Sequence, residues 1–278
     1  MFMNRGFSGF GLGAATTFYQ ANSLVAKFAF LVFVLIVFII LLRLGSSVLG
    51  YFYTPPDNPI LLDGMIDATK MMVVPQNPST KGAVSIVRSD NEKFGMEFTW
   101  SVWIYVEDTT FDDKTKHKHI FHKGNQAKNP NEDGIYYPNN APGLYIAPDT
   151  NDLILKMNTY ESIEETIRVE NFPLNKWINI IIRLNKQNEL DIYINGFLTK
   201  RHMLSGIAKQ NYNDIYLSMN GGFYGYTSSL RYFNSAIGVN EIQNIITTGP
   251  NMAMKSEDIV KSIPKYLSTR WFFDDVQD

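Results

Sequence analysis

The stretch EFTWSVWIYV (residues 97–106) alternates large apolar side chains with polar or aromatic ones. Its apolar positions are Phe98, Trp100, Val102, Ile104 and Val106, and the positions between them are Thr99, Ser101, Trp103 and Tyr105. Successive side chains of a β-strand point to opposite faces, so one face of this segment is strongly apolar. The pattern predicts a strand in the middle of a sheet.

Two later segments repeat the two-residue period. Residues 178–184 (INIIIRL) and 190–194 (LDIYI) are separated by a polar turn at 185–188, which predicts a hairpin. Asn195-Gly196 then supplies the two residues that a type I′ turn needs, because both central positions have positive φ. Residues 197–201 are expected to be the returning strand.

Many short strands are expected elsewhere, at 71–74, 120–122, 144–146, 153–158, 163–169, 215–219 and 224–233. Close spacing without intervening helices predicts a mainly β protein, an antiparallel two-sheet jelly-roll sandwich. Helix signals come late, at 239–245 and at 256–262 with Ser256 as N-cap. We therefore place the sandwich at 81–251 and a short helix with an aromatic tail at 252–278.

Five segments in order carry a family resemblance: EFTWSVWIYV (97–106), HIFHKGN (119–125), PLNKWINIIIRL (173–184), LDIYINGFL (190–198) and GGFYGYTSSLRYFNSAI (221–237). Together they resemble the laminin G-like, concanavalin A-like lectin and glucanase superfamily. With APGLYIAPDTNDL (141–153) and one N-terminal membrane helix, the chain looks most like the membrane-anchored members of large DNA viruses of algae and protists.

The run FAFLVFVLIVFIILL (residues 28–42) has no charge. Fifteen residues are fewer than the roughly 20 that cross a bilayer as a helix. However, Lys27 and Arg43 can place their charges at the two interfaces, and aromatic residues follow at Tyr51 and Tyr53. We predict a single transmembrane helix at 22–49, whose anchor residues include Phe28 and Leu42. A buried core helix and a cleaved signal peptide, with small residues at 45–47, are the alternatives.

The remaining segments are expected to be a Gly- and Phe-rich arm at 1–21 and a Pro-containing stalk at 50–80. Apart from Arg5, Lys27 and Arg43, the chain has 22 basic and 27 acidic residues, a formal charge of −5. This balance argues against nucleic acid as a partner. The chain has no cysteine and no Asn-x-Ser/Thr acceptor, which favours a reducing, unglycosylated compartment for the C-terminal domain.

Structural roles are expected for Trp177 in the core and for Gly196, Gly222 and Gly225 at turns or close approaches. Retaining glucanases of this superfold need Glu-x-Asp-x-Glu along one strand. Here Glu189-Leu190-Asp191-Ile192-Tyr193 places tyrosine where the acid/base carboxylate belongs. We therefore expect no enzyme.

Metal binding has two candidate sets. His117, His119 and His122 are close in sequence, but four lysines surround them, so a solvated charged loop is the favoured interpretation over a metal site. The resemblance implies a calcium site at the sandwich rim, with oxygen donors at Asp108, Asp112, Asp113, Asp149 and Asn151. Ser228 and Ser229 stand where relatives often carry an acid, which argues against an inherited site.

Glycan binding is the function that the superfamily name suggests, with candidate residues Trp103, Tyr105, Asn125, Tyr224 and Tyr226, unless these aromatics pack between the sheet and its loops. A second candidate surface is the tail, where Tyr266, Trp271, Phe272 and Phe273 either dock a partner or cover a sheet face.

Two functions follow from the sequence. The first is a single-pass, non-enzymatic structural or interaction protein that positions the sandwich at a bilayer, as a minor capsid or virion membrane protein linking an internal viral membrane to the coat. Its partners would be capsid or membrane proteins. The second is a membrane-tethered lectin that recognises glycans at a cell or virion surface.

Overall fold

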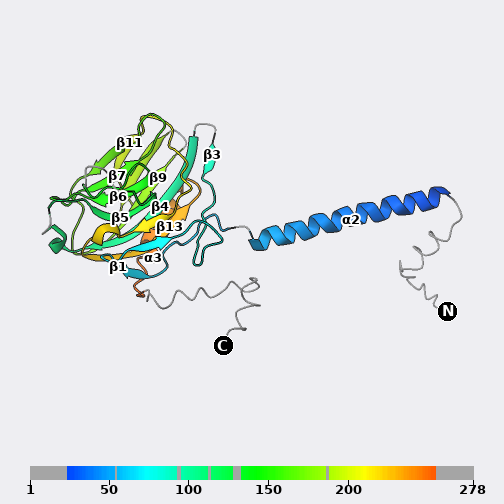
Figure 1. The fold of residues 1–278 in the computed structure, drawn as a ribbon, viewed down its shortest axis with the longest axis horizontal. Coiled ribbons are helices and arrows are strands. Elements are labelled where there is room, and N and C mark those ends of the chain that lie inside the picture. Colours follow the sequence, from blue (N-terminus) through cyan, green and yellow to red (C-terminus); the bar gives the residue numbers. More distant parts are fainter. Residues whose placement is uncertain are drawn as a thin grey trace, which may run out of the picture. The chain divides into compact units, whose positions relative to one another are not determined.

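The structure is a computed structural model that describes residues 24–53, 55–92, 95–111, 114–127, 133–185 and 188–254 (Figure 1). The chain forms two compact units, Met1–Thr54 and Pro55–Asp278. The arm at 1–21, the helix expected at 256–262 and the docking candidates Tyr266, Trp271, Phe272 and Phe273 lie outside the described residues.

The described part of the first unit is the helix α2 (Leu24–Tyr53). It carries the predicted anchor residues Lys27, Phe28, Leu42, Arg43, Tyr51 and Tyr53. The helix continues beyond the expected end at residue 49, since small residues at 45–47 do not interrupt it and the Ser46 hydroxyl donates to the Arg43 carbonyl at 2.9 Å. Residues Leu24–Tyr51 have no buried position, and an 18-residue window within them has a mean hydropathy of 3.1. At 1.5 Å rise per residue they are about 42 Å long, enough to cross a membrane.

The second unit is a sandwich of two antiparallel sheets, as predicted. The first sheet has the order β1 (Met65–Asp67), β13 (Gly225–Phe233), β4 (Gly95–Val106), β9 (Trp177–Leu184), β10 (Glu189–Ile194) and β11 (Phe197–Met203), and β3 (Asp90–Glu92) also pairs with β4. The second sheet has the order β2 (Met72–Val74), β12 (Ile215–Leu217), β5 (Lys118–Gly124), β6 (Asn140–Ile146), β7 (Leu153–Met157) and β8 (Glu165–Val169). Strand β4 lies between β13 and β9, which confirms its central place.

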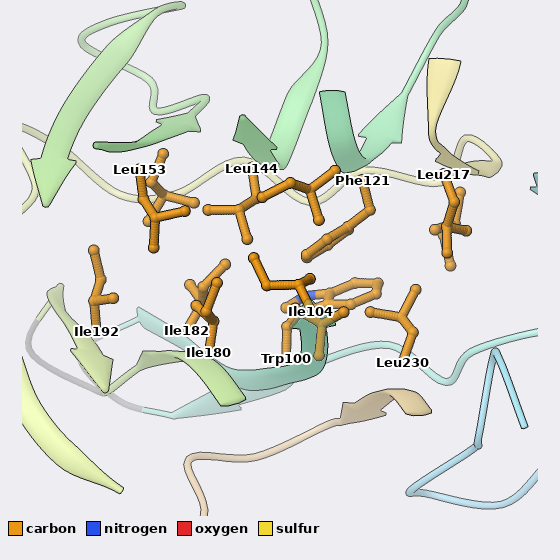
Figure 2. Packing of buried hydrophobic residues seen from close by; sticks show 14 of the residues in the cluster. Trp100, Ile104, Phe121, Leu144, Leu153, Ile180, Ile182, Ile192, Leu217 and Leu230 are labelled. Carbon is orange, nitrogen blue, oxygen red and sulfur yellow. The ribbon is translucent and has the colours of Figure 1, made fainter. Parts of the chain in front are cut away.

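The core lies between the two sheets. Figure 2 shows Trp100, Ile104, Ile180 and Ile182 of the first sheet facing Phe121 and Leu144 of the second. Every second residue of β4 from Phe98 to Val106 is at most 3% exposed, because alternation sends these side chains inward. Burial of this contiguous apolar surface is the main contribution that holds the two sheets together.

The outer face of the first sheet is partly covered by α3 (Val239–Thr248), the late helix that the sequence predicts. Its buried residues Ile242 and Ile245 pack with Ile181 and Phe233. The short helices η1 (Asp108–Phe111) and η2 (Met219–Gly221) connect strands. Because α3 covers the sheet, both faces of β4 are buried at their centre, and even Thr99 and Ser101 are at most 1% exposed.

Two expectations need correction. The segment expected as a stalk contributes Leu61 and Leu62 to the core, at 2% and 0% exposure, and its strand β1 pairs with β13. Its strand β2, which pairs with β12 at the edge of the second sheet, agrees with the strand expected at 71–74. Trp177 does not fill the core. It is half-buried on the outer face, 5.9 Å from the ring of Tyr105, because it lies in register with Tyr105 and so shares that residue's face.

Candidate binding sites

The acidic residues of β10 are held by neighbouring strands. Asp191 is fully buried, and both its oxygens accept hydrogen bonds from Arg201, at 2.7 and 3.1 Å. Arg183 donates a third bond at 3.1 Å. Two guanidinium groups therefore neutralise the Asp191 carboxylate, which would have to be free in a glucanase. Tyr193 lies on the same face, where the pattern requires a second carboxylate.

The candidate calcium donors are only partly brought together. Asp149 and Asn151 lie in the β6–β7 turn and line a cleft of about 540 Å³, which we call the rim cleft. Its other lining residues are Phe111, Lys114, Thr150, Asp152, Arg168, Glu170, Asn171 and Leu174. Asp108 is exposed on η1 and does not line the cleft. Asp112 and Asp113 lie outside the described residues.

The described part of the rim cleft does not fit a calcium ion. Burial alone would raise the pKa of the Asp152 carboxyl, but bonds from the Asn171 backbone, Arg168 and Thr150 outweigh it and lower that pKa. Arg168 thus already neutralises Asp152, and Lys114 adds a positive charge to the lining. Within the described ranges no group of three His, Asp or Glu side chains is arranged to hold a metal.

The candidate glycan-binding residues are dispersed. Trp103 is only 6% exposed, because it lies beside the end of α3 with Ile245 and Thr248, so it offers no surface to a sugar. Tyr105 and Tyr226 remain together on the outer face, 6.3 Å apart between ring centroids, and Tyr224 is exposed nearby in sequence. Asn125 follows β5 in the other sheet. The five residues do not form one site.

A different cleft surrounds Asn125. We call it the amide cleft: it has about 540 Å³ and is lined by Gln76, Asn77, Gly124, Asn125, Gln126, Tyr212, Asn213, Asp214 and Tyr216. The backbone around it is held in place by two hydrogen bonds to Asp214. The backbone N–H of Gln76 donates to Asp214 Oδ1 at 2.7 Å, and the backbone N–H of Gly124 donates to the Asp214 carbonyl at 3.1 Å. Tyr212 is 71% exposed at this cleft. The amide groups can hydrogen-bond to a polar ring, and the exposed tyrosine can stack on it.

Lys123 lies buried beside the amide cleft. Its ammonium donates to the Asn213 carbonyl, and its side chain is only 4% exposed. Burial lowers the pKa of Lys123 to about 8, although the nearby Asp214 carboxylate opposes that shift. The lysine therefore helps to fix the loop that carries Asn213 and Asp214.

The histidines of β5 do not form a solvated loop, which corrects the sequence interpretation. His119 and His122 are 1% and 0% exposed on the outer face of the second sheet, with Nε2 of His119 2.7 Å from Nδ1 of His122. Their spacing of three would place them on opposite faces of a regular strand. The β5–β6 register shifts between His119 and Phe121, and this bulge brings both imidazoles to one side. No feature of the sequence indicates that bulge.

A family model described as the concanavalin A-like lectin/glucanases superfamily matches residues 79–243, more than half of the chain. Among curated proteins, no sequence matches.

Solved structures with a similar fold include the receptor-binding domain of one botulinum neurotoxin and the binding domain of another. The chain is 14% identical to that of botulinum neurotoxin D, with a TM-score of 0.46, covering 67% of this chain and 43% of that one. It is also 14% identical to the binding domain of botulinum neurotoxin serotype G, with a TM-score of 0.44, covering 66% and 46%. This chain therefore spans less than half the length of either structure, and at these values the similarity says nothing about a ligand.

Proposed function

Because this chain belongs to the concanavalin A-like lectin/glucanases superfamily and carries an apolar helix before that domain, we propose that it is a membrane-anchored, non-catalytic interaction protein. The helix fixes the sandwich to a bilayer, and the surface of the sandwich binds partners. Fold alone does not assign a function in this superfamily, so the proposal depends on particular residues.

The exposure of α2 is the observation that carries the proposal. Leu31 and Phe33 are each 61% exposed and Phe38 is 58% exposed, and no position of the 28-residue apolar stretch is buried. In water this surface would be unfavourable at about 25 cal/mol per Å² of apolar area. A hydrocarbon environment removes that cost, and a helix satisfies its backbone hydrogen bonds internally.

The residues of β10 support the proposal that the protein is not an enzyme. Asp191 is held by Arg183 and Arg201, and the position of a second carboxylate is Tyr193. A buried ion pair of this kind stabilises the sheet only while both partners remain, so releasing Asp191 for chemistry would be costly.

The partners that we propose are coat or membrane proteins of a virion with an internal membrane. This part of the proposal is supported by the sequence resemblance to membrane-anchored members in large DNA viruses. The reducing compartment proposed for the sandwich is supported by the absence of cysteines and glycosylation acceptors.

Protease protection tests the topology. Intact membrane vesicles containing the full chain are treated with protease from the cytoplasmic side. Digestion of the sandwich without opening the vesicles supports the proposed compartment, and digestion only after detergent is added contradicts it.

A membrane-tethered lectin is the second candidate, and the amide cleft is the observation that favours it. Its test is binding of the full chain, in detergent micelles, to a glycan array. A lectin should bind and lose its signal in Tyr212→Ala but keep it in Tyr160→Ala, since both tyrosines are 71% exposed and only Tyr212 lines the cleft. Absence of glycan binding by the parent favours the first candidate.

A further inference from the structure

The two buried histidines form one directional hydrogen-bond chain. The Met219 backbone N–H donates to Nδ1 of His119 at 3.0 Å, so that nitrogen is an acceptor and the proton of His119 lies on Nε2. Nε2 then donates to Nδ1 of His122 at 2.7 Å. Nε2 of His122 carries the second proton and faces the Asn125 carbonyl at 3.0 Å. All four ring nitrogens are thus used by two neutral imidazoles.

His122 also holds the segment 133–139 against the second sheet. Its ring stacks on Tyr136 of this segment, with centroids 4.9 Å apart and an angle of 8° between the planes, and on Tyr216 of β12 at 5.2 Å. Ile135 and Tyr136 are 4% and 1% exposed. The Asn139 N–H donates to the Asn125 side chain at 3.3 Å. The histidine pair therefore contacts both Asn125 and the segment 133–139, which covers the pair.

The surroundings offer little compensation for a positive charge. The titratable groups that face the pair are Tyr136, Tyr145 of β6 and Tyr216, which are neutral at physiological pH. Asp133 is next to this cluster in sequence and interacts with Tyr145, while Asp214 interacts with Tyr216 and with Lys123. His117 bonds to the Asp133 carbonyl outside the pair. Burial lowers the pKa of both His119 and His122, the latter to about 4.

One added proton breaks the chain. On Nδ1 of His119 it would oppose the Met219 N–H, and on Nδ1 of His122 it would oppose the Nε2 proton of His119. Either placement replaces a hydrogen bond with two facing donors in a buried site, and buried unsatisfied donors are costly. Opening of the segment 133–139 relieves the conflict by admitting water.

We propose that His119 and His122 form an acid-sensitive latch that holds the segment 133–139 and Asn125 against the second sheet and releases them in mildly acidic conditions. Release would also disturb the amide cleft, because Asn125 and Tyr216 line it. That consequence, regulation of ligand binding by pH, rests on the lectin candidate above. The latch itself does not.

The size of the effect follows from the ordinary histidine pKa of about 6.5 in the open state. Between pH 7 and pH 5 the open population should rise about 25-fold if one histidine is protonated on opening, and several hundred-fold if both are. Opening of the segment should therefore be accompanied by the uptake of nearly two protons.

The test uses a single introduced cysteine, because the chain has none of its own. Ile135→Cys places a thiol under the segment, and Ser79→Cys provides an exposed reference. The full chain in detergent micelles is labelled with 4,4′-dithiodipyridine, which reacts with thiols in acid. Dividing the labelling rate at residue 135 by the labelling rate at residue 79 removes the intrinsic effect of pH on the reagent.

The latch predicts that this ratio rises more than 100-fold from pH 7 to pH 5. His119→Asn or His122→Gln, each in the Ile135→Cys background, should reduce the rise to about 25-fold or less. His202→Gln, on β11 and bonded to Glu165 of β8, should leave it unchanged. Ile181→Cys, buried under α3, should stay protected at pH 5.

The proposal is overturned if residue 135 stays protected at pH 5, or if residue 181 is exposed together with it, since that shows global unfolding. An unchanged pH profile in the two histidine variants also overturns it. If those variants do not fold, the pH dependence of the rate ratio in Ile135→Cys alone decides. Uptake of less than one proton on opening contradicts the latch. The glycan array bears only on the lectin candidate, so the two proposals can fail separately.

Discussion

Trp100 and Trp177 lie in the same sheet on opposite faces, and their environments differ. Trp100 is 2% exposed between the sheets, with its ring 5.5 Å from Phe121 and 5.0 Å from Tyr232. Trp177 is half-buried outside. Trp100→Ala should lower the free energy of unfolding by about 3–5 kcal/mol, because it leaves a core cavity. Trp177→Ala should cost about 1 kcal/mol. Urea unfolding of the full chain measures both, and equal losses would contradict the assigned faces.

Lys123 should make stability depend on pH in an unusual direction. Its pKa is about 8 in the folded chain and about 10.4 when unfolded, so between these values the unfolded chain binds more protons. The free energy of unfolding should therefore rise with pH, by about 1.5 kcal/mol from pH 8 to pH 9.5. The Lys123→Met variant should lose this rise, and unfolding midpoints across the range provide the measurement. A rise of the same size in Lys123→Met would refute the assignment.

Most strands could be predicted because the face of β4, β9 and β10 that meets the core carries an apolar residue at every second position. The hairpin turn was equally predictable: Asn195 and Gly196 have φ of 50° and 81°. The burial of His119, His122 and Trp103 could not be predicted. It depends on a bulge in β5 and on cover from α3 and the segment 133–139, and no local pattern indicates which segments meet.

Gly225 determines how closely β13 approaches β4. Its φ is +137°, and an added Cβ would lie 1.9 Å from the Tyr105 carbonyl oxygen. Gly225→Ala should therefore cost well over 1 kcal/mol, because the two strands must separate. Gly221→Ala is the matched control: its φ is also positive, at +81°, but no atom lies within 4 Å of its Cβ, so it should cost about 1 kcal/mol. Similar unfolding midpoints for the two variants would show that the contact does not matter.

At the scale of the whole molecule, the described part of the chain combines one apolar helix with one sandwich. The sequence indicated both parts, because absence of charge and two-residue alternation are local properties. It misplaced the boundary: residues 55–80 are part of the sandwich, since Leu61 and Leu62 lie in its core. Truncations meant to isolate the sandwich should therefore begin at residue 55 and not at 81.

Membrane retention of the full chain tests the central claim most directly. Membranes from cells expressing residues 1–278 are washed with alkaline carbonate, and the chain in pellet and supernatant is measured by intact mass. An anchor predicts the chain in the pellet with α2 retained. Leu35→Arg with Phe38→Arg should move it out of the pellet, since each charge costs about 3 kcal/mol at the helix centre, and Leu35→Ala with Phe38→Ala should not. Recovery of the parent in the supernatant, cleaved after α2, would contradict the account.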